Sequence, residues 1–70
     1  MKYPRYFVPT GRHKTDATYW RLDAAKYNNL YYFDKDGKPT LCGENINVAE
    51  DAIRNGYIRE IALEELPFYL

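Results

Sequence analysis

Histidine and cysteine, the side chains that most often bind metals or act as nucleophiles and bases, occur once each in this 70-residue chain, as His13 and Cys42. Transition-metal sites combine several such ligands, so one of each does not indicate a metal centre. A catalytic histidine needs a nucleophile or an acid–base partner beside it. Lys14, Asp16 and Arg21 follow His13 closely enough to leave a ribonuclease-like toxin as one hypothesis. No spacing favours that chemistry, and the short chain offers little for a water-excluded cleft, so we expect no enzyme, no cofactor and no metal.

Two loop segments contain residue types that ligand-binding loops use, but not at the spacing that those loops need. The basic loop Gly11-Arg12-His13-Lys14 could hold a phosphate, yet it lacks the GxxxxGK[ST] pattern of a P-loop, and a solvated surface loop is the favoured interpretation. The segment Asp34-Lys35-Asp36-Gly37 begins like a calcium loop. Its glycine is fourth rather than sixth, and Asn45 stands at the twelfth place, where a glutamate is needed. This segment therefore predicts a hairpin turn, because Asp-Gly supplies the positive φ that a tight turn requires.

Aromatic side chains are the most informative feature of the sequence. They make up 17% of the chain, and residues 19–33, YWRLDAAKYNNLYYF, contain six of them. Arg21, Lys26 and Lys35 lie among these rings. Proteins that bind single-stranded nucleic acids stack bases on such rings beside a cationic track, and protein interfaces concentrate Tyr, Trp and Arg at their centres. The zero net charge weakens the nucleic-acid interpretation, because neutralising phosphates dominates that affinity.

The pattern of apolar residues and turn signals predicts a small α+β domain that spans residues 1–70. Strands are expected at residues 5–8, 18–23, 30–33, 39–42 and 57–61, with the first and fourth at the edges because of their prolines. In the second strand, Trp20 and Leu22 are expected to face inward. The prediction is an antiparallel sheet of four to five strands with one short helix packed on one face.

The helix is expected at about residues 47–55. Asn47 is a good N-cap with Glu50 three residues on, and Asn55-Gly56 supplies the stop. One more helical turn is expected at residues 62–66, and the apolar residues 67–70 must either dock on the fold or form a sticky end. Nothing in the sequence covers the sheet face away from the helix. We expect exposed aromatic side chains there, either Tyr19, Tyr31 and Phe33 or, in the other register, Tyr32 and Leu30.

Charge is distributed unevenly along the chain. Residues 1–40 hold eight basic and four acidic side chains, whereas residues 41–70 hold two basic and six acidic ones. Such asymmetry indicates either a polyanion-binding face and an acidic partner surface or two halves that mix on folding. A single cysteine excludes an internal disulfide, and we expect Cys42 to be a small buried side chain. The chain has no apolar run that resembles a signal peptide or a membrane span, so we expect a cytoplasmic protein.

Four segments together, YFVPTG, TYWRLD, LYYFDKDGK and GYIREIALEEL, resemble a pattern found in small uncharacterised proteins of bacteriophages and mobile elements. The resemblance covers most of the chain and defines no functional residue. It implies a small intracellular protein, and phage proteins of this kind often bind and block a host protein, including defence systems such as CRISPR.

The leading functional hypothesis is therefore a non-enzymatic binding protein that inhibits a host protein by contact. Its predicted contact residues are Tyr19, Arg21, Tyr31, Phe33, Glu64 and Glu65. Self-association as a homodimer through the same face is equally compatible. The alternative is a module that binds nucleic acid or nucleotide through Arg12, His13, Lys14, Arg21 and Lys26.

Overall fold

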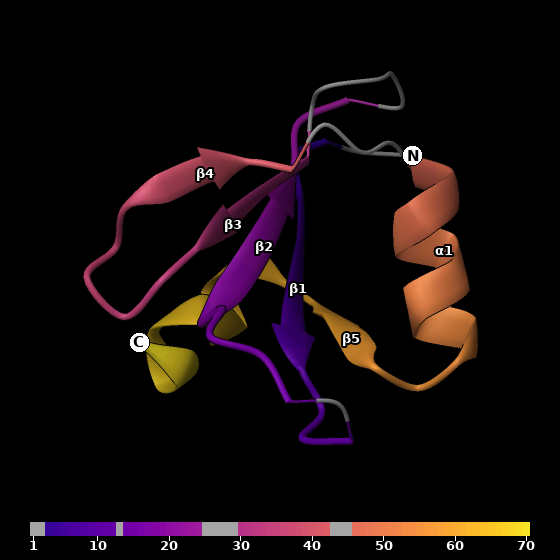
Figure 1. Ribbon diagram of the computed structural model, residues 1–70. Helices are drawn as coiled ribbons and strands as arrows, with labels where there is room; N and C mark the ends of the chain where they lie inside the picture. The colour runs from indigo at the N-terminus through magenta and orange to yellow at the C-terminus, as the bar shows by residue number, and fades with distance from the viewer. Residues whose placement is uncertain (1–2, 13, 25–29, 43–45) are drawn as a thin grey trace.

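Five antiparallel strands form one sheet in the order β4-β3-β2-β1-β5, with a helix on one face (Figure 1). The computed structural model describes residues 3–12, 14–24, 30–42 and 46–70, with only the backbone described at 46–48. None of the helices in these ranges has both the length and the apolar character to cross a membrane. The elements are β1 (Arg5–Pro9), β2 (Tyr19–Leu22), β3 (Leu30–Phe33), β4 (Pro39–Leu41), α1 (Ile46–Arg54), β5 (Ile58–Ile61) and a C-terminal 3₁₀ helix (Leu63–Tyr69).

The predicted α+β class is confirmed, and the strands lie within about two residues of their expected bounds. The prediction that the first strand lies at an edge was wrong, because β1 lies between β2 and β5. Its prolines do not interrupt the ladder: Pro4 precedes the strand and Pro9 is its last residue. A proline at the end of a strand removes no hydrogen-bond donor from the middle of a sheet, and so it does not restrict the strand to an edge. The short β4 is at an edge, as its own proline predicted.

The turn between β3 and β4 is the predicted hairpin. The Asp34 side chain accepts hydrogen bonds from the backbone N–H groups of Asp36 and Lys38, at 2.9 and 3.1 Å. Gly37 has a φ of 75°, and its N–H donates to the Asp34 carbonyl at 2.9 Å. A side chain that bonds to its own turn in this way explains why the segment begins with aspartate.

The main core lies between α1 and the sheet. Alternation along the strands points Phe7, Leu22, Leu30 and Ile58 toward Ala49 of the helix, and Phe7 and Leu22 are completely buried. Trp20 and the half-buried Cys42 pack against this cluster. The predicted inward direction of Trp20 and Leu22 is confirmed.

The helix begins one residue earlier than predicted, so Asn47 is its second residue rather than its N-cap. Residues 43–45, just before it, lie outside the described ranges. The predicted stop is confirmed: Gly56 has a φ of 77°, its N–H donates to the Ile53 carbonyl, and the Tyr57 N–H donates to the Ala52 carbonyl. These two bonds are the pair that closes a helix when a residue in the left-handed region follows it, which a glycine adopts at low cost.

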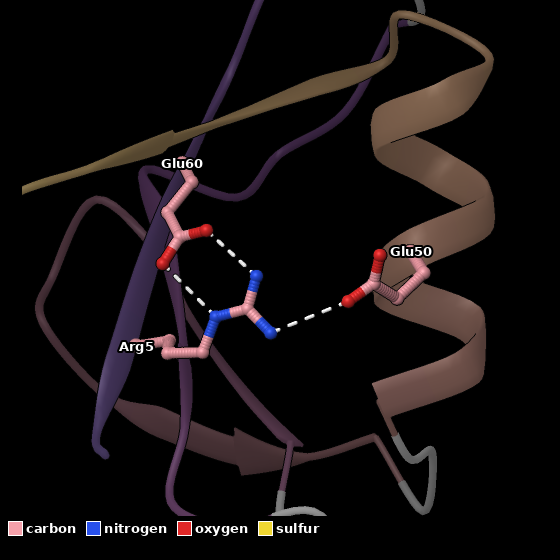
Figure 2. Close-up of polar contacts among 3 residues, drawn as sticks. All are labelled: Arg5, Glu50 and Glu60. Carbon is pink, nitrogen blue, oxygen red and sulfur yellow. Dashed lines mark hydrogen bonds and ion pairs between the residues drawn. The ribbon is translucent and has the colours of Figure 1, made fainter. Parts of the chain in front are cut away.

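A buried arginine ties α1 to the sheet (Figure 2). Arg5 is 6% exposed, and it donates from Nε and Nη2 to the two carboxylate oxygens of Glu60, at 2.9 and 2.6 Å, and from Nη1 to Glu50 Oε1 at 3.4 Å. The hydrogen bond to Glu60 raises the pKa of Arg5, although burial opposes it, so the group is charged at all ordinary pH values. The cluster pairs one basic residue of the N-terminal half with two acidic residues of the C-terminal half. At this point the two halves of the chain mix their charges.

The opposite sheet face is covered in part, which was not expected from the sequence. The C-terminal 3₁₀ helix packs Leu66 against Val8 of β1 and Ile61 of β5, and all three are buried. The expectation that nothing covers this face was therefore wrong for its β1–β5 half. The predicted turn at residues 62–66 is instead a seven-residue 3₁₀ helix that continues through Pro67. Its start is fixed by Glu65, whose side chain accepts from the Ala62 N–H at 3.3 Å while its own N–H donates to the Ala62 carbonyl.

Candidate interaction surface

The other half of that face, over β2, β3 and β4, is where the aromatic side chains gather. The strand register aligns them in two rows: Arg21 faces Tyr31, which faces Leu41, and Tyr19 faces Phe33, which faces Pro39. We call these six residues the open face. The register selects Tyr19, Tyr31 and Phe33 of the two sets that the sequence left open and places Leu30 and Tyr32 on the helix side.

Stacking and cation–π contacts hold the open face in place. The rings of Tyr19 and Phe33 are parallel within 5°, with centroids 4.3 Å apart. The Arg21 guanidinium lies 5.3 Å from the centroid of Tyr31 and 5.2 Å from that of Phe33. Its Nε also donates to Asp23 Oδ1 at 2.7 Å. A guanidinium restrained by two rings and a carboxylate loses little freedom on binding, which favours its use as a contact residue.

The predicted contact residues differ in how much surface they offer. Tyr19, Arg21 and Tyr31 are half-buried, whereas Phe33 is only 6% exposed because Tyr19 and Arg21 lie over it. Phe33 therefore supports the surface from beneath. Leu41 was missed, although it is 48% exposed at the end of the Tyr31 row. The predicted hairpin could have identified Leu41, because pairing β3 with β4 sets it opposite Tyr31.

The C-terminal 3₁₀ helix carries a second set of exposed groups. Glu64 and Glu65 are exposed, as the predicted contact role requires. Beside them, Leu63 is 58% exposed, Phe68 84% and Leu70 72%. Of the two outcomes expected for residues 67–70, docking applies to Tyr69, which packs against Val8, Ile61 and Leu66 and whose hydroxyl accepts a hydrogen bond from Arg59 Nη2. Phe68 and Leu70 extend into solvent.

A groove of about 500 Å³ connects these two surfaces. The turn before β4 forms one wall and the C-terminal residues form the other. The groove is lined by Thr18, Tyr19, Asp34, Lys35, Asp36, Gly37, Tyr69 and Leu70. Because Tyr19 belongs to the open face and Tyr69 to the C-terminal helix, the groove makes the two one continuous surface.

Tyr19, which belongs to this surface, has a perturbed pKa. Its partial burial raises its pKa from the ordinary value of 10.0, and the nearby Arg21 charge opposes that rise. Tyr19 therefore remains a neutral phenol at physiological pH. It can donate and accept hydrogen bonds from its hydroxyl while its ring stacks on Phe33.

The residues of the nucleic-acid alternative do not gather at one site within the described ranges. Arg12 and Lys14 line a shallow recess of the loop after β1, where the Arg12 side chain packs against Gly56. Arg21 lies on the open face and is paired with Asp23. His13 and Lys26 lie outside the described residues. The structure thus shows no common cationic track for the three described members of this set.

Metal chemistry has no support from the described part of the chain. In residues 3–12, 14–24, 30–42 and 46–70, no group of three or more His, Cys, Asp or Glu side chains is arranged to hold an ion. The turn at residues 34–37, which begins like a calcium loop, instead uses its first aspartate to bind backbone N–H groups.

No protein-family model matches the chain, and no curated protein and no solved structure is significantly similar to it. The resemblance to small phage and mobile-element proteins accordingly remains a hypothesis that rests on the sequence pattern. The geometry that bears on function is the pairing of a pre-ordered aromatic–arginine face with exposed apolar groups of the C-terminal helix.

Proposed function

We propose that this chain is a non-enzymatic binding protein that engages a protein partner through the open face and the adjoining C-terminal 3₁₀ helix. The observation that carries the proposal is the exposure of large apolar side chains along this surface: Leu41, Leu63, Phe68 and Leu70 are all about half exposed or more. Apolar groups that gather on one surface are typical of an interaction site. Phe68 is the clearest case, because water surrounds most of a large aromatic ring that contributes almost no burial to the fold.

The chemistry of this surface indicates what the partner presents. Tyr31 and Arg21 are residue types that dominate binding energy at interfaces, and both are already ordered by their neighbours. Glu64 and Glu65 are exposed beside Leu63, so the partner's apolar surface is expected to have a basic rim there. Phe68 and Leu70 would enter apolar depressions in the partner, with the two carboxylates facing Lys or Arg.

The biological setting is the part of this proposal that the sequence resemblance supports. The protein would act in the cytoplasm as an inhibitor of a host protein such as a component of a phage-defence system. Inhibition would be steric or would mimic an acidic ligand of the target. Self-association through the same surface is the alternative that an experiment must first distinguish from binding to a host protein.

The test begins with the purified protein in size-exclusion chromatography with light scattering, followed by identification of whatever co-purifies from host lysate at moderate salt. The proposal expects a monomer that captures one protein. Phe68→Ser should weaken binding of the purified partner at least about tenfold, with no change in thermal midpoint, because the ring is exposed. Arg54→Ser is the matched control, since Arg54 is exposed on α1, away from the open face.

Two results would overturn the proposal. One is that Phe68→Ser and Leu63→Ser both bind the partner with the affinity of wild type. The other is a protein that retains an oligonucleotide rather than a protein, with an affinity that falls steeply as salt rises.

A further inference from the structure

A second cavity lies on the opposite side of the sheet, between α1 and the strands. Its volume is about 170 Å³, and it shares no residue with the open face or the C-terminal helix. Its lining is Thr15, Trp20, Leu30, Ala49, Ala52, Tyr57 and Ile58. The interface proposed above does not use it.

The cavity exists because the helix presents small residues to the sheet. Ala49 and Ala52 stand three residues apart and therefore lie on the same face of α1. Both belong to the packed interface with the sheet, where the strands contribute the larger side chains Trp20, Leu30 and Ile58. Methyl groups do not reach far enough to fill the space that the longer side chains of a typical helix face would occupy.

The lining runs from a buried floor to an exposed rim. Leu30 and Ala49 are buried, whereas Thr15 and Tyr57 are exposed. The cavity is therefore accessible from solvent at the rim, where the two lining residues with hydroxyl groups stand. A ligand can enter without unfolding of the core.

The chemistry of the lining selects the ligand. None of the described lining residues carries a formal charge, so an ion would lose its hydration without gaining a partner. A closed apolar cavity of about 150 Å³ is large enough to bind benzene. The observed volume therefore fits a single six-membered ring, with the indole of Trp20 available for an aromatic contact.

We propose that this cavity is a binding site for a small, neutral, single-ring aromatic molecule with one polar substituent, of which phenol is a simple example. The ring would lie against Trp20 and Ile58 beneath the two alanines. Its polar substituent would face the rim, within the reach of hydroxyl-bearing Thr15 and Tyr57. Because the cavity lies on the far side of the sheet, it can be occupied together with the protein-binding surface.

The test uses phenol as the probe and benzoate as its charged counterpart. In a titration followed by amide and indole NMR shifts, phenol should cause saturable changes at Trp20, Ala49, Ala52 and Ile58, with a dissociation constant on the order of 1 mM for so few atoms. Benzoate should bind more weakly than phenol, because its carboxylate would give up part of its hydration at a rim where the described lining residues offer no cation. Wild-type protein that shows no saturable shift with phenol, or equal binding of benzoate, would overturn the proposal.

A variant that fills the cavity separates this site from surface binding. Ala52→Leu keeps a strong helix former in α1, and it should weaken phenol binding at least about tenfold while raising the thermal midpoint. Ala62→Leu is the matched control, since Ala62 is exposed and does not line the cavity. Thr15→Leu, which changes an exposed rim residue, provides a second reading if Ala52→Leu does not fold, and it should weaken phenol at least about threefold. If Ala52→Leu and Thr15→Leu, or whichever of the two folds, bind phenol as tightly as wild type, the proposal is contradicted.

Discussion

The two faces of the sheet are covered to different extents, and the difference separates the stabilising core from the surface proposed for binding. On the helix side, Phe7 and Leu22 are completely buried and Arg5 forms an ion cluster with two glutamates. On the other side, a 3₁₀ helix buries Val8, Ile61 and Leu66 and leaves the aromatic rows over β2–β4 partly in solvent. The first face therefore holds most of the core, and the second carries the exposed groups of the proposed binding surface.

Both covering elements lie toward the same end of the sheet. Helix α1 packs mainly on β5, and the C-terminal 3₁₀ helix packs on β1. Figure 1 shows the β3–β4 hairpin extending on the side away from α1. All three residues of β4 are exposed. A sheet of five strands is wider than either cover, so its far end is left exposed to solvent.

The largest effect that tests this division is a truncation on each face. Phe7→Ala should lower the free energy of unfolding by about 3–5 kcal/mol, because it removes a completely buried ring from the main core. Leu66→Ala should cost only about 2 kcal/mol, at the low end for a buried leucine, since the second cluster is small and the C-terminal helix that covers it can shift to fill the space. Urea unfolding measures both.

A cost for Leu66→Ala equal to that of Phe7→Ala would contradict the division into a strong and a weak face. If Phe7→Ala gives no folded baseline, the milder Phe7→Leu replaces it. Phe7→Leu should still lower the free energy of unfolding by more than Leu66→Val does, which likewise removes only part of a side chain.

The sequence predicted the local elements well because their signals are local. Asp34 to Gly37 determine a turn, Asn55-Gly56 ends a helix, and alternation around Trp20 sets the direction of a strand. The position of β1 was not predictable in this way, since strand order depends on long-range pairing with residues 58–61. The cover by Leu66 was missed for the same reason. Whether residues 67–70 dock or stay exposed was left open, because the surface that they meet decides which of these side chains are buried.

The candidate surface was predicted in part. The aromatic composition and period-two alternation pointed to Tyr19 and Tyr31, but only the register shows that Phe33 lies beneath Tyr19 and Arg21. The small cavity could not be read from the chain, since it arises where two alanines of α1 meet large strand residues. Such juxtapositions depend on the distance between helix and sheet, which no sequence pattern specifies.

An intermediate effect is expected at the ion pairs of the two faces. Glu60→Ala should cost about 2–3 kcal/mol, because it leaves the buried Arg5 charge with only the longer contact to Glu50. Arg5→Met should cost less, since it removes the buried charge itself and leaves two partly exposed glutamates that water can solvate.

The matched comparison is the pair Arg21–Asp23 on the open face, where both side chains are partly exposed. Asp23→Asn should change stability by only about 0–1 kcal/mol. Chemical denaturation of the three variants gives the free energy of unfolding of each and so ranks the three losses. An Arg5→Met loss larger than that of Glu60→Ala would mean that the arginine contributes mainly through packing on Phe7, whose ring centroid lies 5.3 Å from its guanidinium carbon.

The smallest expected effect is a pH dependence that reports burial on the open face. Desolvation raises the pKa of Tyr19 in the folded state above the value of 10.0 that applies to the unfolded chain. As the pH rises, the Tyr19 hydroxyl therefore loses its proton in the unfolded chain before it does so in the folded protein. The resulting stabilisation is complete below pH 10 and is lost as the pH rises through the folded value. Tyr19→Phe keeps the ring that stacks on Phe33 and removes the titrating group. Denaturant midpoints of wild type and Tyr19→Phe, measured from about pH 8 to about pH 11, should therefore run parallel at first and then diverge, with wild type falling more steeply. All other tyrosines are common to both proteins, so curves that stay parallel throughout would show that Tyr19 is as solvated as in the unfolded chain and that the open face is looser than its stacked rings indicate.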